Sequence, residues 1–190
     1  MKRHDRAIVM GVSAGGTDAL RQILPVLPPE FPFPIIVVQH LHPQQDDYLA
    51  QHYDSLCALS IKEAEEKETI QPGFVYIAPA NYHLLIEDDR TFSLSIDPRV
   101  NFARPSVDVL FESAADVYRA LLIGVVLTGA NQDGAAGLHI IQKNGGLVVV
   151  QDPATAQASA MPQAAIVATQ KPHIIPLNGI GPFLVQLSRL

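Results

Sequence analysis

Short apolar runs alternate with amphipathic stretches along most of the chain. Residues 7–10 (AIVM), 34–40 (PIIVVQH), 121–129 (LLIGVVLTG) and 147–150 (LVVV) are mainly apolar, as expected of strands buried on both faces. Between the first two runs, apolar residues recur at the spacing of one helical face, at Leu20, Ile23, Leu24 and Leu27. The opening therefore predicts a βαβ unit with parallel strands.

The middle of the chain has a different pattern. Residues 74–78, 82–87 and 91–96 are short strand-like runs, separated by the turn sequences PAN and DDR. This spacing predicts an antiparallel hairpin, at a sheet edge or in a flap.

Capping residues and helix breakers place the later helices. Ser106 is expected to cap a helix, and Gly145-Gly146 to end the helix that follows residue 133. Pro162 is expected to begin a short helix that runs to about Thr169. We therefore expect one domain over residues 1–190, an α/β fold with a doubly wound, mostly parallel sheet flanked by helices and an antiparallel β-hairpin insertion.

Composition and charge narrow the classes of function. The 190 residues are 48% hydrophobic and 17% charged, which suits a folded core, and the net charge of -6 argues against a non-specific nucleic-acid binder. Cys57 is the only cysteine, so no internal disulfide can form. The N-terminal apolar run is too short for a signal peptide, and no run approaches a membrane span. We expect a soluble cytoplasmic protein with no membrane insertion.

Three residues follow the predicted strands where ligands bind in open α/β sheets, beyond the carboxyl ends. Ser13 follows the first strand, His40 ends the second, and Asp133 lies four residues past the strand ending at Gly129. These residue types suit a nucleophile, a general base and an acid that orients the base.

Each of the three also has an ordinary structural explanation. Ser13 could be a turn or cap residue, and Asp133 could be the N-cap of the next helix. His40 could be a hydrogen-bonded strand-end histidine, and His42 competes with it for the role of base. Their joint placement at strand ends favours a catalytic site.

Two phosphate-binding motifs are alternatives for the sequence GVSAGG (residues 11–16), and the residues present do not match either of them. A dinucleotide-binding loop would have glycine in place of Ser13 and a carboxylate closing the second strand, whereas this strand ends in Gln39-His40. A Walker loop would contain a lysine, which is absent here.

A metal site is a weaker alternative, because no clear spacing fixes a third ligand beside His40 and His42. The nearby candidates are Asp46, Asp47 and His52.

Residues 11–15 fit the G-x-S-x-G pattern of a nucleophile elbow. The chain order is Ser, His, Asp, however, whereas α/β-hydrolases have the order Ser, Asp, His. The order excludes that family but not the chemistry, because triads recur on unrelated folds.

Six spaced blocks give the chain a resemblance to the catalytic domain of the chemotaxis protein-glutamate methylesterases, the CheB family. The blocks are GVSAGG (11–16), VVQHLHP (37–43), VYIAPANYHL (75–84), RPSVDVLFES (104–113), GVVLTGANQDGAAGL (124–138) and AMPQAA (160–165). The resemblance implies a catalytic triad of Ser13, His40 and Asp133, with His40 preferred to His42. It also implies methyl-ester hydrolysis, with glutamine deamidation as the family's second reaction, on chemoreceptor cytoplasmic helices without metal or cofactor.

Other residues of these blocks are candidates for supporting roles. Backbone groups at Ala14, Gly15, Gly16 and Ala130 are expected near the oxyanion, because free N–H groups at a helix N-terminus favour negative charge. Arg104 and Met161 are candidates for the substrate groove, with a surface cation and a core residue as the ordinary alternatives.

The chain departs from the family pattern at several positions. Where many members have threonine, methionine, glycine, asparagine and histidine, this chain has Ala14, Ala130, Asn131, Gln132 and Ala103. The resemblance also implies a receiver domain before the catalytic domain in full-length members, and we expect none within these residues. A serine esterase for another substrate, or a non-catalytic binding module, remains an alternative.

Overall fold

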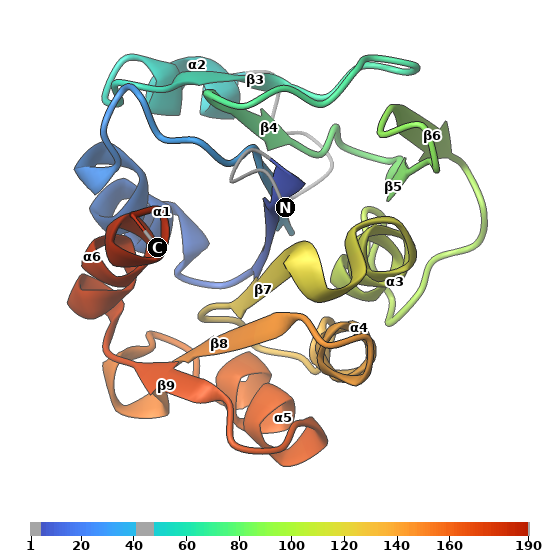
Figure 1. Cartoon of the computed structure of the whole chain (residues 1–190). Helices are drawn as coiled ribbons and strands as arrows, with labels where there is room; N and C mark the ends of the chain where they lie inside the picture. The colour runs from blue at the N-terminus through green and yellow to red at the C-terminus, as the bar shows by residue number, and fades with distance from the viewer. Residues whose placement is uncertain (1–4, 41–47, 190) are drawn as a thin grey trace.

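A seven-stranded parallel sheet forms the centre of the molecule (Figure 1). The computed structural model describes residues 5–40 and 48–189. The strand order is β3-β4-β2-β1-β7-β8-β9, and every pair is parallel. The strands are β1 (Ala7–Val12), β2 (Ile35–Gln39), β3 (Ser60–Glu63), β4 (Phe74–Ile77), β7 (Leu122–Val126), β8 (Leu147–Gln151) and β9 (His173–Ile175).

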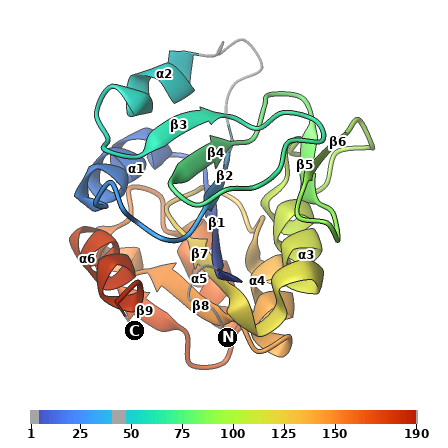
Figure 2. The same cartoon turned by 45° about the horizontal axis from the view of Figure 1, so that its top comes forward.

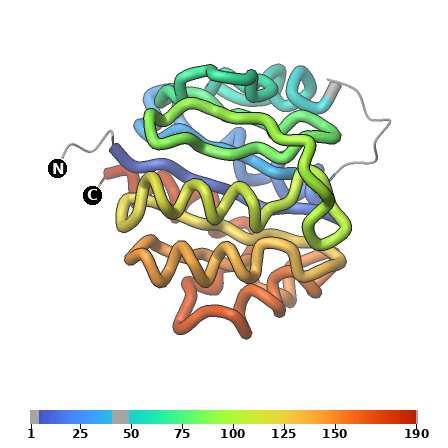
Figure 3. Tube along the Cα trace, turned by 90° about the vertical axis from the view of Figure 1, so that its right-hand side faces the viewer, coloured from blue at the N-terminus to red at the C-terminus, as the bar shows by residue number. Residues whose placement is uncertain are grey.

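Helices cover both faces of the sheet, which confirms the doubly wound α/β prediction (Figures 1 and 2). One face carries α1 (Gly16–Ile23), α2 (Tyr48–Asp54) and α6 (Leu177–Leu187). The other carries α3 (Val107–Tyr118), α4 (Ala135–Lys143) and α5 (Ala160–Ala168). Figure 3 shows α3 and α4 side by side along this second face.

The central strand explains why the sequence shows continuous apolar runs rather than alternation. Ala7 and Val9 on β1 belong to the core under α3 and α4, whereas Ile8, Met10 and Val12 belong to the core under α1 and α6. Successive side chains point to opposite faces, so a strand covered on both sides is apolar at every position.

The predicted hairpin is present as a separate two-stranded antiparallel sheet, β5 (His83–Ile86) with β6 (Phe92–Ser95). It is joined to α3 by the backbone N–H of Ile86, which donates to Ser113 Oγ at 3.1 Å. The preceding run, residues 74–78, instead enters the main sheet as β4, parallel to β2. Of the three strand-like runs in the middle region, only the second and third therefore form the antiparallel hairpin.

Several elements were not predicted from the sequence. They are α2, β3, β9 and α6. In α6, Gly179, Gly181 and Pro182 are helix breakers by local rules, and packing of Ile180 and Leu184 in the core overrides them. The short helix expected to begin at Pro162 begins two residues earlier, at Ala160, and ends at Ala168.

The sheet topology brings three loops to one edge. β1 pairs with β2 on one side and with β7 on the other, so the chain leaves these neighbouring strands at the same end. This is the position at which the strand order reverses, where a crevice forms beyond the carboxyl ends of the strands. The segments after β1, β2 and β7 carry Ser13, His40 and Asp133 respectively.

Candidate active site

The loop after β1 holds Ser13 in a fixed turn. The backbone N–H of Ser13 donates to the Thr128 carbonyl at 3.0 Å, and Thr128 Oγ1 donates to the Ala14 carbonyl at 2.8 Å. Gly15 has φ of 80°, a conformation that glycine adopts without a steric cost, and it turns the chain into α1. The Ser13 hydroxyl makes no hydrogen bond to any residue that the structure describes, so it is available to a ligand.

The backbone donors around Ser13 differ from the sequence expectation at one position. Within residues 5–40 and 48–189, the N–H groups of Ala14, Gly15 and Ala130 donate to no protein acceptor. The Gly16 N–H is already engaged, because it donates to the Ser13 carbonyl at 2.8 Å. Gly16 therefore closes the turn, and the other three N–H groups remain candidates for binding an oxyanion.

His40 directly follows β2 and is held by its neighbours. Its backbone N–H donates to the Val12 carbonyl at 2.9 Å, which extends the parallel register past the strand. The preceding residue, Gln39, is buried; its side-chain amide donates to Thr17 Oγ1 and accepts from the Tyr53 hydroxyl, both at 3.1 Å. These bonds tie the end of β2 to α1 and α2, so the backbone that carries His40 is fixed.

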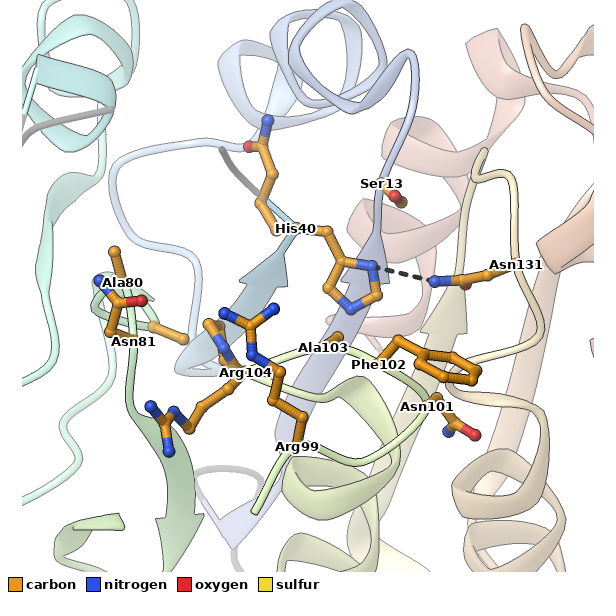
Figure 4. Close-up of a pocket in the computed structure, with 13 residues that line it drawn as sticks. Ser13, His40, Ala80, Asn81, Arg99, Asn101, Phe102, Ala103, Arg104 and Asn131 are labelled. Carbon is orange, nitrogen blue, oxygen red and sulfur yellow. Dashed lines mark hydrogen bonds between the residues drawn. The ribbon is translucent and has the colours of Figure 1, made fainter. Parts of the chain in front are cut away.

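The side chains of His40 and Asp133 form a buried pair. His40 Nε2 lies 2.8 Å from Asp133 Oδ2, and the two side chains are 13% and 0% exposed. In chymotrypsin-like proteases the aspartate bonds Nδ1. Here it bonds Nε2, and Nδ1 is the nitrogen on the side of Ser13 and Asn131 (Figure 4). The pair can therefore act as a general base only through Nδ1.

Asp133 accepts hydrogen bonds from five different residues. Its oxygens are 2.7 to 3.1 Å from these donors. The donors are His40 Nε2, Asn101 Nδ2, Ser106 Oγ, Val107 N and Asp108 N.

These bonds decide between the alternatives for Asp133 and Ser106. Asp133 does not cap the helix that follows it, since α4 has Gly134 at its N-cap position with no side-chain cap bond. It binds instead the first N–H groups of α3, at Val107 and Asp108. Ser106 occupies the N-cap position of α3 as predicted, but its hydroxyl donates to Asp133 rather than capping its own helix.

The electrostatics of the pair follow from these contacts. Burial by itself raises the pKa of Asp133, but hydrogen bonds from His40 and Asn101, together with those from backbone N–H groups, hold it below the ordinary value. Asp133 is therefore charged at neutral pH and can stabilise a protonated His40. Burial raises the pKa of the neighbouring Asp108, and the nearby charge of Asp133 adds to this effect.

A tight turn supplies the asparagine that joins the two carboxylates. Val100 and Ala103 exchange both backbone hydrogen bonds, and the two residues between them, Asn101 and Phe102, have φ of 51° and 64°. The turn directs Asn101 Nδ2 to Asp108 Oδ2 at 2.7 Å and to Asp133 Oδ1 at 2.9 Å. Phe102 is 96% exposed at the tip.

A cavity of about 270 Å³ contains both Ser13 and His40. Arg99 and Arg104 also line it, and Figure 4 places both on the side of the cavity away from Asn131. Arg104 Nη1 donates to the carbonyls of Ile96 and Asp97 at 2.7 and 3.1 Å. These bonds hold the Arg104 side chain against the segment that follows β6. Arg99 is exposed and forms no ion pair within the described residues.

Met161 does not fulfil the expectation of a groove residue. It is 1% exposed and does not line the cavity of Ser13. A Cβ added at Gly129 would collide with its sulfur atom, so Met161 packs directly beneath that glycine. The alternative of a core residue is therefore correct.

The metal alternative draws no support from the described residues. Within residues 5–40 and 48–189, no group of three or more His, Cys, Asp or Glu side chains is arranged to hold a metal ion. His42, Asp46 and Asp47 lie outside the described residues.

Several residues of the site were not predicted from the sequence. Thr128, Asn101, Asn131 and Arg99 contact the loop or line the cavity. Thr128 and Asn131 lie close to Asp133 in the sequence, and this proximity could have identified them as residues of the site. Asn101 and Arg99 lie more than 30 residues before Asp133, in the segment between β6 and α3, and only the tertiary structure places Asn101 against Asp133 and Arg99 in the cavity wall.

The fold and the site together define a doubly wound α/β protein with a buried His–Asp pair beside a serine at the carboxyl ends of its strands. The model of the CheB methylesterase family matches residues 8–184. The chain belongs to the CheB methylesterase family.

Individual relatives agree with this assignment. A Leptospira interrogans protein, whose name proposes methylesterase and glutaminase activities, is 55% identical over 96% of this chain and 95% of its own length. The protein-glutamate methylesterase/protein-glutamine glutaminase of Thermotoga maritima is 37% identical over 96% of this chain and 54% of its own length. The crystal structure of the Thermotoga maritima CheB methylesterase catalytic domain superposes with a TM-score of 0.91 at 37% identity, covering 96% of this chain and 98% of that one. Among the described residues, no helix has the length and apolar character needed to cross a membrane.

Proposed function

We propose that this chain is a protein-glutamate methylesterase that hydrolyses glutamate γ-methyl esters through an acyl-enzyme on Ser13. The observation that carries the proposal is the buried His40–Asp133 pair, whose histidine shares a cavity with Ser13. Membership of the CheB methylesterase family supports it. We place the substrate on the cytoplasmic helices of a chemoreceptor, and the protein therefore in the cytoplasm.

In the first half of the proposed reaction, Ser13 Oγ attacks the ester carbonyl and its proton passes to His40 Nδ1. The charged carboxylate of Asp133 stabilises the imidazolium that forms. The N–H groups of Ala14, Gly15 and Ala130, which donate to none of the described residues, stabilise the negative charge on the carbonyl oxygen. His40 then gives the proton to the leaving oxygen, and methanol departs.

In the second half, a water molecule gives a proton to His40 and attacks the glutamyl-serine ester. The products are a free glutamate carboxylate and the regenerated Ser13. Deamidation of glutamine would follow the same course, with ammonia leaving in place of methanol. The proposed reaction uses no metal or organic cofactor.

The test is release of methanol from receptor membranes that carry labelled methyl esters. We expect the purified chain to release it and Ser13→Ala to release none, while its fold stays intact because Ser13 Oγ bonds to none of the residues that the structure describes. Ser60→Ala is a matched control, since Ser60 is an exposed residue at the start of the edge strand β3. Near-normal release by Ser13→Ala would contradict the assignment of the nucleophile.

A serine-reactive phosphonate separates the alternatives. Labelling without methanol release would indicate a serine hydrolase that acts on another ester. Absence of both, in a folded protein, would favour a binding module without catalytic activity.

A further inference from the structure

Asn131 lies beside the candidate base, and its side chain is held in one orientation. Its Oδ1 accepts the backbone N–H of Asp133 at 3.1 Å. The carbonyl end of the amide is therefore fixed, because an amide nitrogen could not accept that N–H. The other end, Nδ2, lies 3.4 Å from His40 Nδ1 (Figure 4).

The two neighbours of the imidazole specify the same tautomer. The charged carboxylate of Asp133 can only accept, so Nε2 of His40 carries the proton of their 2.8 Å bond. The amide nitrogen of Asn131 can only donate, so Nδ1 carries a lone pair. A proton on Nδ1 would face the hydrogens of this amide.

We propose that Asn131 is a positioning residue that keeps Nδ1 of His40 unprotonated and so keeps the histidine ready to accept the Ser13 proton. The proposal rests on the proposed roles of Ser13 and His40. It assigns a task to a position where the family pattern has glycine and this chain has a side chain.

The length of the contact between Asn131 and His40 is consistent with a hydrogen bond that breaks during the reaction. At 3.4 Å, the bond from Asn131 to His40 lies beyond the usual range for an N–H donor and is weak. When the Ser13 Oγ–carbon bond forms, the Oγ proton moves to Nδ1 and the amide contact is lost. The proton later leaves Nδ1 for the departing methoxide oxygen, and the contact with Asn131 returns.

Other charged groups around His40 do not interfere with a test at Asn131. Asp133 faces the Nε2 side of the ring, with Asp108 behind it across Asn101. The cations Arg99 and Arg104 line the same cavity as His40. A substitution of Asn131 removes none of these charged groups, and it changes the Nδ1 side of His40 and the acceptor of the Asp133 backbone N–H.

Two variants separate the proposed role from a merely structural one. In Asn131→Asp, one oxygen can still accept the Asp133 N–H, while the other places a negative charge at Nδ1. His40 should then protonate more readily, and the acidic limb of the kcat/KM profile should move to higher pH by about one to three units. At a pH on the acidic side of the profile, each pH unit of this shift lowers kcat/KM about tenfold. Asn131→Ala removes the weak donor to Nδ1 together with the acceptor of the Asp133 N–H, and introduces no charge. The limb should therefore move in the same direction by less.

Nitrogen NMR of His40 gives a readout that does not depend on turnover. The native protein should show a protonated Nε2 and an unprotonated Nδ1, whereas Asn131→Asp should show both nitrogens protonated at a pH where the native ring is neutral. Gln132→Ala is the control, because Gln132 is exposed, adjacent in sequence and makes no hydrogen bond to His40. It should match the native protein in both measurements.

The proposal is overturned if both Asn131 variants keep the native pH profile and the native nitrogen signals. It is also overturned if Gln132→Ala shifts the profile as much as Asn131→Ala does. Ser13→Ala, assayed alongside, reports separately on the proposed function, since its inactivity would uphold the nucleophile whatever Asn131 does. If no variant releases methanol, the nitrogen signals still decide the role of Asn131.

Discussion

Replacing Asp133 with asparagine tests the catalytic and the structural role of this residue together. The new amide presents one oxygen and one NH2 group to the five donors that the carboxylate satisfies. Three donors surround Oδ1, from Asn101, Ser106 and Asp108, and two surround Oδ2, from His40 and Val107. The NH2 group should therefore take the place of Oδ2, where it opposes fewer donors.

In that orientation the amide donates to Nε2 of His40, and the ring proton must move to Nδ1. The histidine can then no longer accept the Ser13 proton, so kcat/KM should fall by about 10³–10⁴-fold. The Val107 N–H loses its acceptor in a buried place, which costs about 1–3 kcal/mol. The loss of a negative charge at the N-terminus of α3 adds to this cost. Together the two effects should lower the free energy of unfolding by about 2–4 kcal/mol.

The pH dependence of stability has a definite sign. The folded-state pKa of Asp133 is below its ordinary value, so its charge stabilises the fold at neutral pH, and this contribution is lost as pH falls through the folded-state pKa. The difference in unfolding free energy between the native protein and Asp133→Asn should therefore narrow below about pH 4, the ordinary value for aspartate.

The measurements are kcat/KM for methanol release, urea unfolding at pH 7 and pH 3, and nitrogen NMR of His40. Asp116→Asn is a suitable control, because Asp116 lies exposed on α3 and contributes nothing to the site. A rate loss below tenfold, or a His40 ring that keeps its proton on Nε2, would refute the reasoning from hydrogen-bond donors.

Further substitutions test other parts of the site and the fold. His40→Gln should abolish methanol release, whereas His42→Gln should have a much milder effect in the same assay. Asn101→Ala removes the donor shared by two buried carboxylates, and urea unfolding should show a loss of about 1–3 kcal/mol. Phe102→Gly should not lower the melting temperature. It should raise the free energy of unfolding by up to about 1 kcal/mol, because an exposed phenylalanine at φ of 64° is strained. Gly11→Ala should cost about 1–3 kcal/mol, because the added Cβ would collide with a side chain of α3.

The sequence by itself determined the frame of this protein. Continuous apolar runs at β1, β2, β7 and β8 record burial on both faces, and Gly145 marks the end of α4. Parallel strands end at a common edge, so Ser13, His40 and Asp133 could be placed near one another before any contact was known. The local pattern identifies each strand, and the strand-end rule then places the residues that follow the strands at one edge, so no contact between distant residues has to be known.

Only the tertiary structure decided what each group in the site does. Asp133 binds the N-terminus of α3, which precedes it by 25 residues, and Asn101 reaches it from a turn 32 residues away. The burial of Met161 likewise follows from the packing of α5. The spacing of residue types does not specify which side chains bond to one another within the site, because those bonds depend on how distant elements pack and which buried polar groups must find partners.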